Sequence, residues 1–130
     1  MDPMSILGDM TAEERTVMIT AVEESYLSGV IGDFLGHAER HGAVWNFSGD
    51  ADAIRALIPR FARVVRDMIA RDLVEIREPA DDAWDNAPSL SMSEVDAVLS
   101  DQRTWLWSAE GNNRMVMIMT TAYADRLLGR

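Results

Sequence analysis

Residues 50–78 constrain the fold most strongly, because a long helical repeat in this stretch changes to a strand repeat within a few residues. On a helix of 3.6 residues per turn, its apolar side chains gather on one face and its basic side chains on the other. The apolar set is Ile54, Leu57, Ile58, Phe61, Val64, Val65, Met68 and Ile69, and the basic set is Arg55, Arg60, Arg63, Arg66 and Arg71. We expect an amphipathic helix with one face in a core and the other directed to water or to an anion.

This helix contains a proline and is followed by a strand. Pro59 lies well inside the apolar pattern, where proline removes one backbone hydrogen bond and costs about 3 kcal/mol. The sequence therefore predicts either a kink at Pro59 or a split into two helices, the second with Pro59 in its first turn. After Asp72 the period becomes two, and residues 73–78 alternate as a half-buried strand.

A first helix is predicted over residues 12–24. Thr11 and Glu14 have the spacing of a capping box, in which a hydroxyl and a carboxylate satisfy backbone donors at a helix start. The side chains expected to face the core are Met18, Ala21 and Val22, and the opposite side is acidic with Glu13, Glu23 and Glu24. This acidic side is either a solvated surface or a docking surface.

The remaining elements are shorter. Before the long helix we expect a turn or a very short strand over residues 25–29, a helix over 30–40 and a loop over 43–50. After it we expect a helix over 92–99 that Ser91 and Glu94 cap, strands over 104–108 and 115–121, and a final helical turn. These elements predict one α+β domain over residues 1–130, with three N-terminal helices, a small antiparallel sheet and a short inserted helix. Residues 1–10 are expected to be a flexible N-terminus.

Charge argues against broad contact with anionic surfaces. The chain has 22 acidic and 12 basic residues and a net charge of −10, which disfavours binding to phosphate backbones or anionic lipid. Residues 1–54 carry ten acids and two arginines, a local charge of −8, whereas residues 55–78 carry six arginines and four acids, a local charge of +2. The arginine face of the long helix is therefore the exception in a chain that repels nucleic acid.

Enzymatic and metal-dependent functions have little support in the sequence. The chain lacks cysteine, so structural disulfides and thiolate metal sites are excluded, and no phosphate loop, nucleophile elbow or zinc-protease motif occurs. Asp33, His37 and His41 follow helical spacing that could hold a divalent metal, but a capping or core-edge role near a helix C-terminus is the interpretation we favour. We expect no catalysis, no metal and no cofactor.

The expected location is cytoplasmic. No segment approaches the roughly 18 continuous apolar residues of a membrane span, and the start MDPMSILGDM lacks the basic and apolar regions of a signal peptide.

The order of elements over about residues 11–128 resembles a winged helix-turn-helix domain. The resemblance rests on a helix that ends in VVRDMIARDLVEIRE and on later strands that close in TTAYADRLL; small uncharacterised actinobacterial proteins are similar in these features and in a Trp-containing loop. It implies a helix, a wing and a returning strand. Asp72 replaces the usual glycine at the helix-to-strand junction, and the wing would carry an acidic insertion with Asp81, Asp82 and Asp85 around Trp84.

Two functional hypotheses follow. In the first, the chain is a non-enzymatic protein-binding module, for instance an immunity or antitoxin-like inhibitor, whose acidic surface docks on a basic partner. The residues expected at that surface are Asp81, Asp82, Trp84, Asp85, Trp45, Glu13 and Glu14. In the second, a winged-helix regulator lays Arg55, Arg60, Arg63 and Arg66 against DNA. A third interpretation pairs these arginines with the chain's own acids, such as Glu13 or Asp33.

Overall fold

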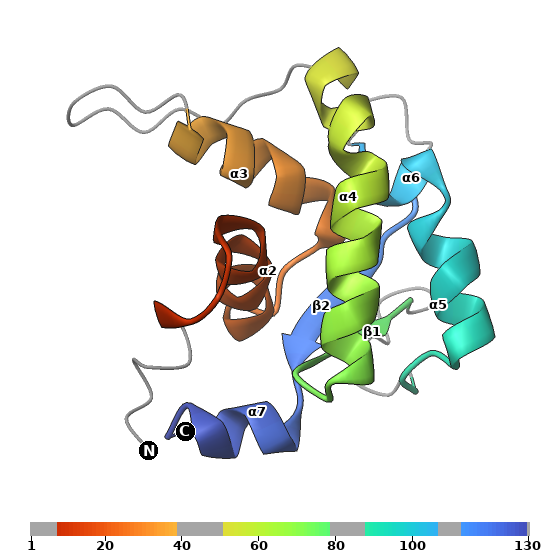
Figure 1. Cartoon of the computed structure of the whole chain (residues 1–130). Coiled ribbons are helices and arrows are strands. Elements are labelled where there is room, and N and C mark those ends of the chain that lie inside the picture. Colours follow the sequence, from red (N-terminus) through yellow and green to blue (C-terminus); the bar gives the residue numbers. More distant parts are fainter. Residues whose placement is uncertain (1–7, 39–50, 79–87, 107–112, 130) are drawn as a thin grey trace.

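The computed structural model describes residues 8–38, 51–78, 88–106 and 113–129. Its elements are, in order, α2 (Ala12–Val22), the 3-10 turn η1 (Leu27–Gly29), α3 (Val30–Ala38), α4 (Ala51–Ala70), β1 (Val74–Arg77), α5 (Met92–Leu99), α6 (Gln102–Trp105), β2 (Met117–Thr120) and α7 (Ala122–Leu127). The described part of the chain is thus a mostly helical α+β structure with N-terminal helices, two antiparallel strands, and short helices between and after the strands (Figure 1).

Both predicted capping boxes are confirmed. The Thr11 hydroxyl accepts a hydrogen bond from the Glu14 amide at 3.1 Å, and the Glu14 carboxylate accepts one from the Thr11 amide at 3.0 Å. Ser91 and Glu94 make the same reciprocal pair at the start of α5. At its other end α2 stops two residues before the predicted position, because Glu24 adopts a left-handed backbone conformation with φ of 52°.

The sheet is small and has an additional contact at one edge. Strands β1 and β2 pair antiparallel, with Val74 opposite Thr120 and Ile76 opposite Ile118. On the other edge of β2, Tyr26 forms a single antiparallel bridge with Met117. The segment predicted as a turn or a very short strand is therefore one bridge followed by η1.

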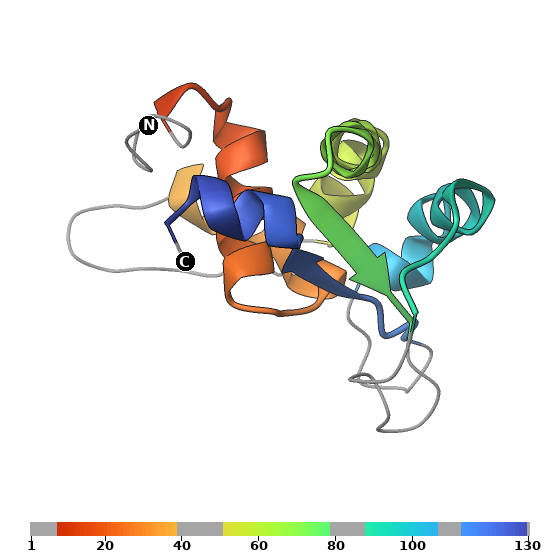
Figure 2. The same ribbon diagram turned by 90° about the horizontal axis from the view of Figure 1, so that it is seen from below.

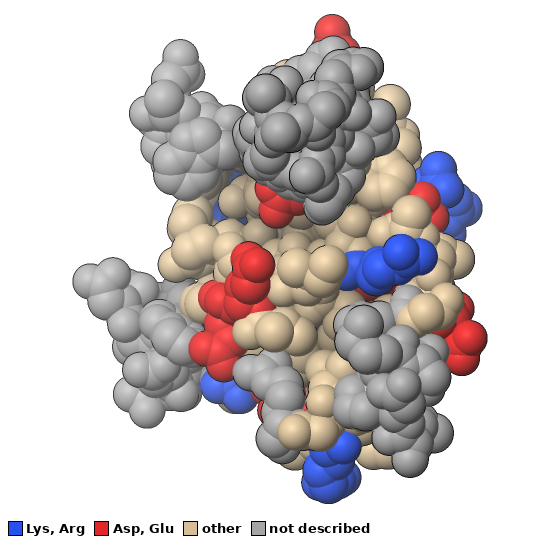
Figure 3. Space-filling model, turned by 90° about the vertical axis from the view of Figure 1, so that its left-hand side faces the viewer, with Lys and Arg blue, Asp and Glu red and all other residues tan. Residues whose placement is uncertain are grey.

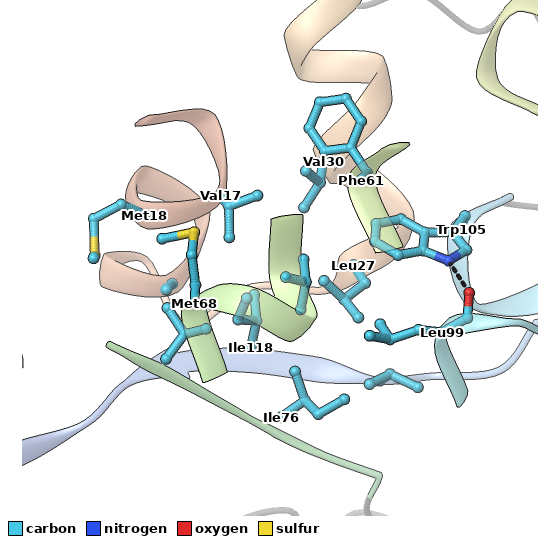
Figure 4. Packing of buried hydrophobic residues seen from close by; sticks show 14 of the residues in the cluster. Val17, Met18, Leu27, Val30, Phe61, Met68, Ile76, Leu99, Trp105 and Ile118 are labelled. Atoms are coloured by element: carbon cyan, nitrogen blue, oxygen red, sulfur yellow. Dashed lines mark hydrogen bonds between the residues drawn. The ribbon is translucent and has the colours of Figure 1, made fainter. Parts of the chain in front are cut away.

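Helix α4 lies between α2 and α5, and α2 and α4 pack against the strands. Figures 1 and 2 show this order from two directions, and α7 lies at the end of β2. The core beneath α4 contains Phe61, Met68, Leu27, Ile76 and Ile118, which are all at most 1% exposed (Figure 4). The hydrophobic face predicted for residues 54–69 is the face that packs into this core.

Helix α4 continues through Pro59, so the predicted alternative of two separate helices is wrong. Pro59 is exposed. The backbone carbonyl four residues earlier, which would accept a hydrogen bond from an amide at this position, therefore lies on the solvent side of the helix. The free-energy penalty of the missing hydrogen bond is lowest there, because water can satisfy that carbonyl.

Helix α4 ends in a Schellman motif, which explains how the chain turns into β1. The Leu73 amide donates to the Met68 carbonyl and the Asp72 amide donates to the Ile69 carbonyl, both at 3.0 Å. Asp72 has a φ of 57°, the left-handed conformation in which glycine is usual and Asn or Asp is tolerated. The aspartate at this junction thus adopts the geometry that glycine would have taken.

The strand predicted over residues 104–108 is wrong over its described part, because residues 102–105 form α6. The Asp101 side chain accepts a hydrogen bond from the Arg103 amide and caps this short helix. The Thr104 hydroxyl donates to the Val98 carbonyl at 2.7 Å, and the Trp105 indole N–H donates to the Leu99 carbonyl at 3.0 Å (Figure 4). These bonds satisfy acceptors at the end of α5, so a tertiary contact overrides the strand propensity of the TWLWS run.

Candidate functional site

The exposed side of α4, with Arg71 directly after the helix, is the first candidate surface, since all five arginines of the predicted basic face are exposed. Arg63 is two residues from both Phe61 and Val65, which places it about 200° around the helix from each and directly opposite the core. The other four arginines form two flanking rows, Arg60 with Arg71 and Arg55 with Arg66. Each row has a spacing of eleven residues, about three helical turns.

The row of Arg60 and Arg71 is paired with acids of α2. Arg60 lies 2.8 Å from the Glu13 carboxylate, and Arg71 lies 2.8 Å from the Glu14 carboxylate and 3.3 Å from that of Asp67. The Glu13 and Glu14 side chains are only 12% and 17% exposed. Glu13 and Glu14, two of the seven residues predicted for the docking surface, are therefore already engaged within the chain, and Glu13 is paired as the third sequence interpretation proposed.

The row of Arg55 and Arg66 lies on the side of α4 that faces α5. Arg66 lies 2.6 Å from Asp96 of α5, with both side chains 52% exposed. Arg55 pairs with Asp52 one turn earlier on its own helix, at 3.1 Å. Taken together, three of the four arginines of α4, and Arg71 directly after it, have carboxylate partners in the chain itself.

Arg63 differs from the other four. Among the described residues it has no hydrogen-bond or ion-pair partner. It borders an open groove of about 370 Å³ between the start of α2 and the middle of α4. The groove is lined by Thr11, Glu13, Glu14, Arg60, Arg63, Val64 and Asp67. Three carboxylates and two guanidinium groups thus surround it, a composition suited to polar contacts with a macromolecule and not to an apolar small molecule.

Proton equilibria at this surface favour the charged forms. The Thr11 amide that donates to the Glu14 carboxylate lowers the pKa of Glu14; burial opposes that shift, and the hydrogen bond from Arg71 adds to it. The hydrogen bond to Glu14 in turn raises the pKa of Arg71. The hydrogen bond to Asp96 likewise raises the pKa of Arg66. These pairs remain ionised at neutral pH.

A second charged cluster lies where β1 ends and β2 approaches. The Arg114 guanidinium donates to both Glu78 oxygens and, at 3.3 Å, to Asp101, while Arg103 contacts Asp101 at 2.7 Å. Hydrogen bonds from Arg103 lower the pKa of Asp101 to about 2, against an opposing effect of burial. An open groove of about 470 Å³ is lined by Glu78, Arg103, Asn113, Arg114 and Met115.

Sequence reasoning did not single out this second cluster. Its four charged members are separated by up to 36 positions, so periodicity carries no sign of their contact. A local signal was available only for Asp101, whose position two residues before Arg103 is that of a helix N-cap.

Most residues predicted for partner binding lie outside the described residues. Asp81, Asp82, Trp84, Asp85 and Trp45 fall in this group, as does His41, and the side chain of His37 is likewise not described. Asp33 is half-buried on α3. Within the described ranges, no three histidine, aspartate or glutamate side chains are grouped as a metal site requires.

Within the same ranges, none of the helices has the length and apolar character needed to cross a bilayer. Comparison with family models, with curated proteins and with solved structures finds no match to this chain.

Proposed function

We propose that this chain is a non-enzymatic protein-binding module that docks an acidic surface on a basic partner. The observation that supports this proposal best is the internal pairing of Arg55, Arg60, Arg66 and Arg71. These pairs neutralise carboxylates as well as arginines, so most of the acidic excess behind the net charge of −10 lies elsewhere in the chain, where it would form the acidic surface. Such a surface steers a basic protein toward it and repels nucleic acid.

The acidic loop that follows β1 is the proposed docking element. It carries Asp81, Asp82 and Asp85 around Trp84, a combination in which carboxylates speed the encounter and an indole supplies an apolar anchor. Arg114 forms an ion pair with Glu78, the last described residue before this segment. An immunity or antitoxin-like inhibitor is the class of protein that this arrangement suits.

The experiment is a binding titration with the product of a neighbouring gene that co-purifies with the tagged chain. We expect the association rate to fall with rising salt and to fall further when Asp81, Asp82 and Asp85 are replaced by Asn, since these charges would steer the encounter. A matched control is Asp9→Asn, Glu24→Gln and Asp72→Asn, which removes the same charge from exposed positions elsewhere in the chain. An equal loss in both triple variants would assign the effect to net charge and would contradict docking by the loop.

A second candidate, a winged-helix DNA-binding regulator, has one specific observation in its favour. The order of α2, the Tyr26 bridge, α3, α4, β1 and β2 resembles that of a winged helix, with α5 and α6 inserted between the two strands, and the bridge joins the segment before α3 to β2. In this proposal α4 would enter a groove and Arg63, directed away from the core, would contact phosphate. The paired arginines would first have to leave their carboxylates, which weakens this candidate.

Fluorescence anisotropy with mixed-sequence duplex DNA at about 50 mM salt separates the two candidates, because phosphate contacts are strongest at low salt. The first proposal predicts no binding. Salt-sensitive binding that Arg63→Glu abolishes and Arg126→Glu on α7 preserves would favour the regulator, since both variants change net charge equally.

A further inference from the structure

The outer face of α2 exposes two apolar side chains that the helical pattern did not predict. Ile19 and Val22 are 47% and 37% exposed, whereas the same helix buries Val17, Met18 and Ala21 on its other side. The two lie at positions i and i+3 and are adjacent on the surface. Both are β-branched residues of modest helix propensity, so their presence on an exposed helix face needs a reason other than helix formation.

Two opposite charges flank this apolar pair at equal distances. Arg15 precedes Ile19 by four residues and Glu23 follows it by four, so each lies about 6 Å from Ile19 along the helix axis. Both side chains are exposed, and neither makes an ion pair among the described residues. The Arg15 guanidinium has only one hydrogen bond there, to the Met10 carbonyl at 3.3 Å. Figure 3 shows the molecule from the side on which α2 lies in Figure 1, and on this face neutral surface separates acidic from basic groups.

We propose that a second copy of this chain docks on this face, with the two α2 helices antiparallel and Ile19 at the two-fold axis. An isologous contact requires a surface that is complementary to itself. Antiparallel pairing about Ile19 places Arg15 of each copy opposite Glu23 of the other and buries Ile19 against its symmetry mate. This inference rests on neither of the two functions proposed above.

The symmetry of the charges argues for a second copy over an unrelated partner. A strongly basic protein would be repelled by Arg15, and a strongly acidic one by Glu23, whereas a copy of the same helix satisfies both. The contact is short, because α2 has 11 residues and a helix of that length spans roughly 17 Å. Interfaces of this size are weak, so we expect a dissociation constant on the order of 100 µM.

A charge-swap cycle followed by sedimentation equilibrium tests the proposal. We expect the full chain to reach a monomer–dimer equilibrium as its concentration rises toward about 1 mM. Arg15→Glu and Glu23→Arg should each weaken the dimer about tenfold, because each turns two attractive pairs into two repulsive pairs. Each variant also places a charge at the helix end that favours it, so loss of folding does not explain a loss of association.

The double variant Arg15→Glu with Glu23→Arg should restore the wild-type dissociation constant, because it re-forms both pairs with their signs exchanged. Ile19→Glu should abolish association. The control is Met92→Glu on α5, which lies on the side of α4 away from α2; Met92 is 40% exposed, and this variant should leave association unchanged. A wild-type chain that stays monomeric to about 1 mM, or a double variant that associates no better than the single ones, would overturn the proposal.

Discussion

The two flanks of α4 carry similar ion pairs in different surroundings. On the α2 side, Arg60 and Arg71 meet carboxylates that are 12% and 17% exposed. On the α5 side, Arg66 meets Asp96 with both side chains 52% exposed. The distances are 2.8, 2.8 and 2.6 Å, so geometry alone does not rank the pairs. Solvent screening and side-chain entropy make the exposed pair the weaker one, and we expect the α2 flank to hold α4 in place.

The largest expected effect is at Glu14, which serves both the capping box of α2 and the pair with Arg71. Glu14→Ala should lower the free energy of unfolding by about 1–2 kcal/mol, because it removes the reciprocal cap and the ion pair together. Urea unfolding followed by circular dichroism measures this change.

Glu14→Gln separates the two contributions, because glutamine retains the reciprocal cap and loses the charge. We expect it to recover at least half of the loss. A loss as large as that of Glu14→Ala would instead place most of the stabilisation in the ion pair with Arg71.

The next effect in size is at Arg60. Arg60→Ala should lower the free energy of unfolding by roughly 1 kcal/mol, because the largely covered Glu13 carboxylate loses its partner. The double variant with Glu13→Gln should recover part of the loss, since no unpaired charge is left. If the loss of stability in the double variant equals the sum of the losses in the two single variants, the two side chains do not interact in solution.

The α2 flank should also give a smaller, pH-dependent effect. The pKa of Glu14 is lowered in the folded chain, so the carboxylate stabilises the fold above its unfolded pKa of about 4.5, and that stabilisation is lost as the pH falls through the folded pKa. The pKa of Asp101, outside the α2 flank, is lowered from 3.8 to about 2. Its carboxylate therefore also stabilises the fold above pH 3.8, and this stabilisation is lost as the pH falls toward 2. Urea midpoints measured between pH 5 and 2 should show a shallower slope in Glu14→Gln and in Asp101→Asn than in the wild type.

The smallest effect is expected on the α5 flank. Asp96→Asn should leave the urea midpoint unchanged within error, because its ion pair with Arg66 is exposed on both sides. A shift as large as that of Arg60→Ala would contradict the proposed difference between the flanks and would show that burial does not set the strength of these pairs.

Local patterns predicted α4 much better than α2. In α4 the apolar and charged residues are strictly separated, so the buried face follows directly from the 3.6-residue period. In α2 the buried set includes Thr20 and excludes Val22, so the prediction that Val22 faces the core was wrong. The Thr20 hydroxyl donates to the Thr16 carbonyl one turn earlier, which lets a polar side chain be buried without an unsatisfied group.

The candidate site could be predicted only in its composition. The exposed arginines of α4 follow from its period, and their two rows are already present in the spacings from Arg55 to Arg66 and from Arg60 to Arg71. Which acids they meet could not be predicted, because Arg71 and Glu14 are 57 positions apart and Arg66 and Asp96 are 30 apart. Such contacts depend on how α2 and α5 are placed beside α4.

The sequence by itself determined the features that depend on neighbours within about one helical turn or on strand alternation. These are the capping boxes at Thr11 and Ser91, the core face of α4, and the alternation of β1. Only the tertiary structure decided that Trp105 lies in a helix, that four arginines are neutralised, and that Ile19 and Val22 face outward. The physical reason is that hydrogen bonds and burial between distant segments outweigh propensities worth a few tenths of a kcal/mol per residue.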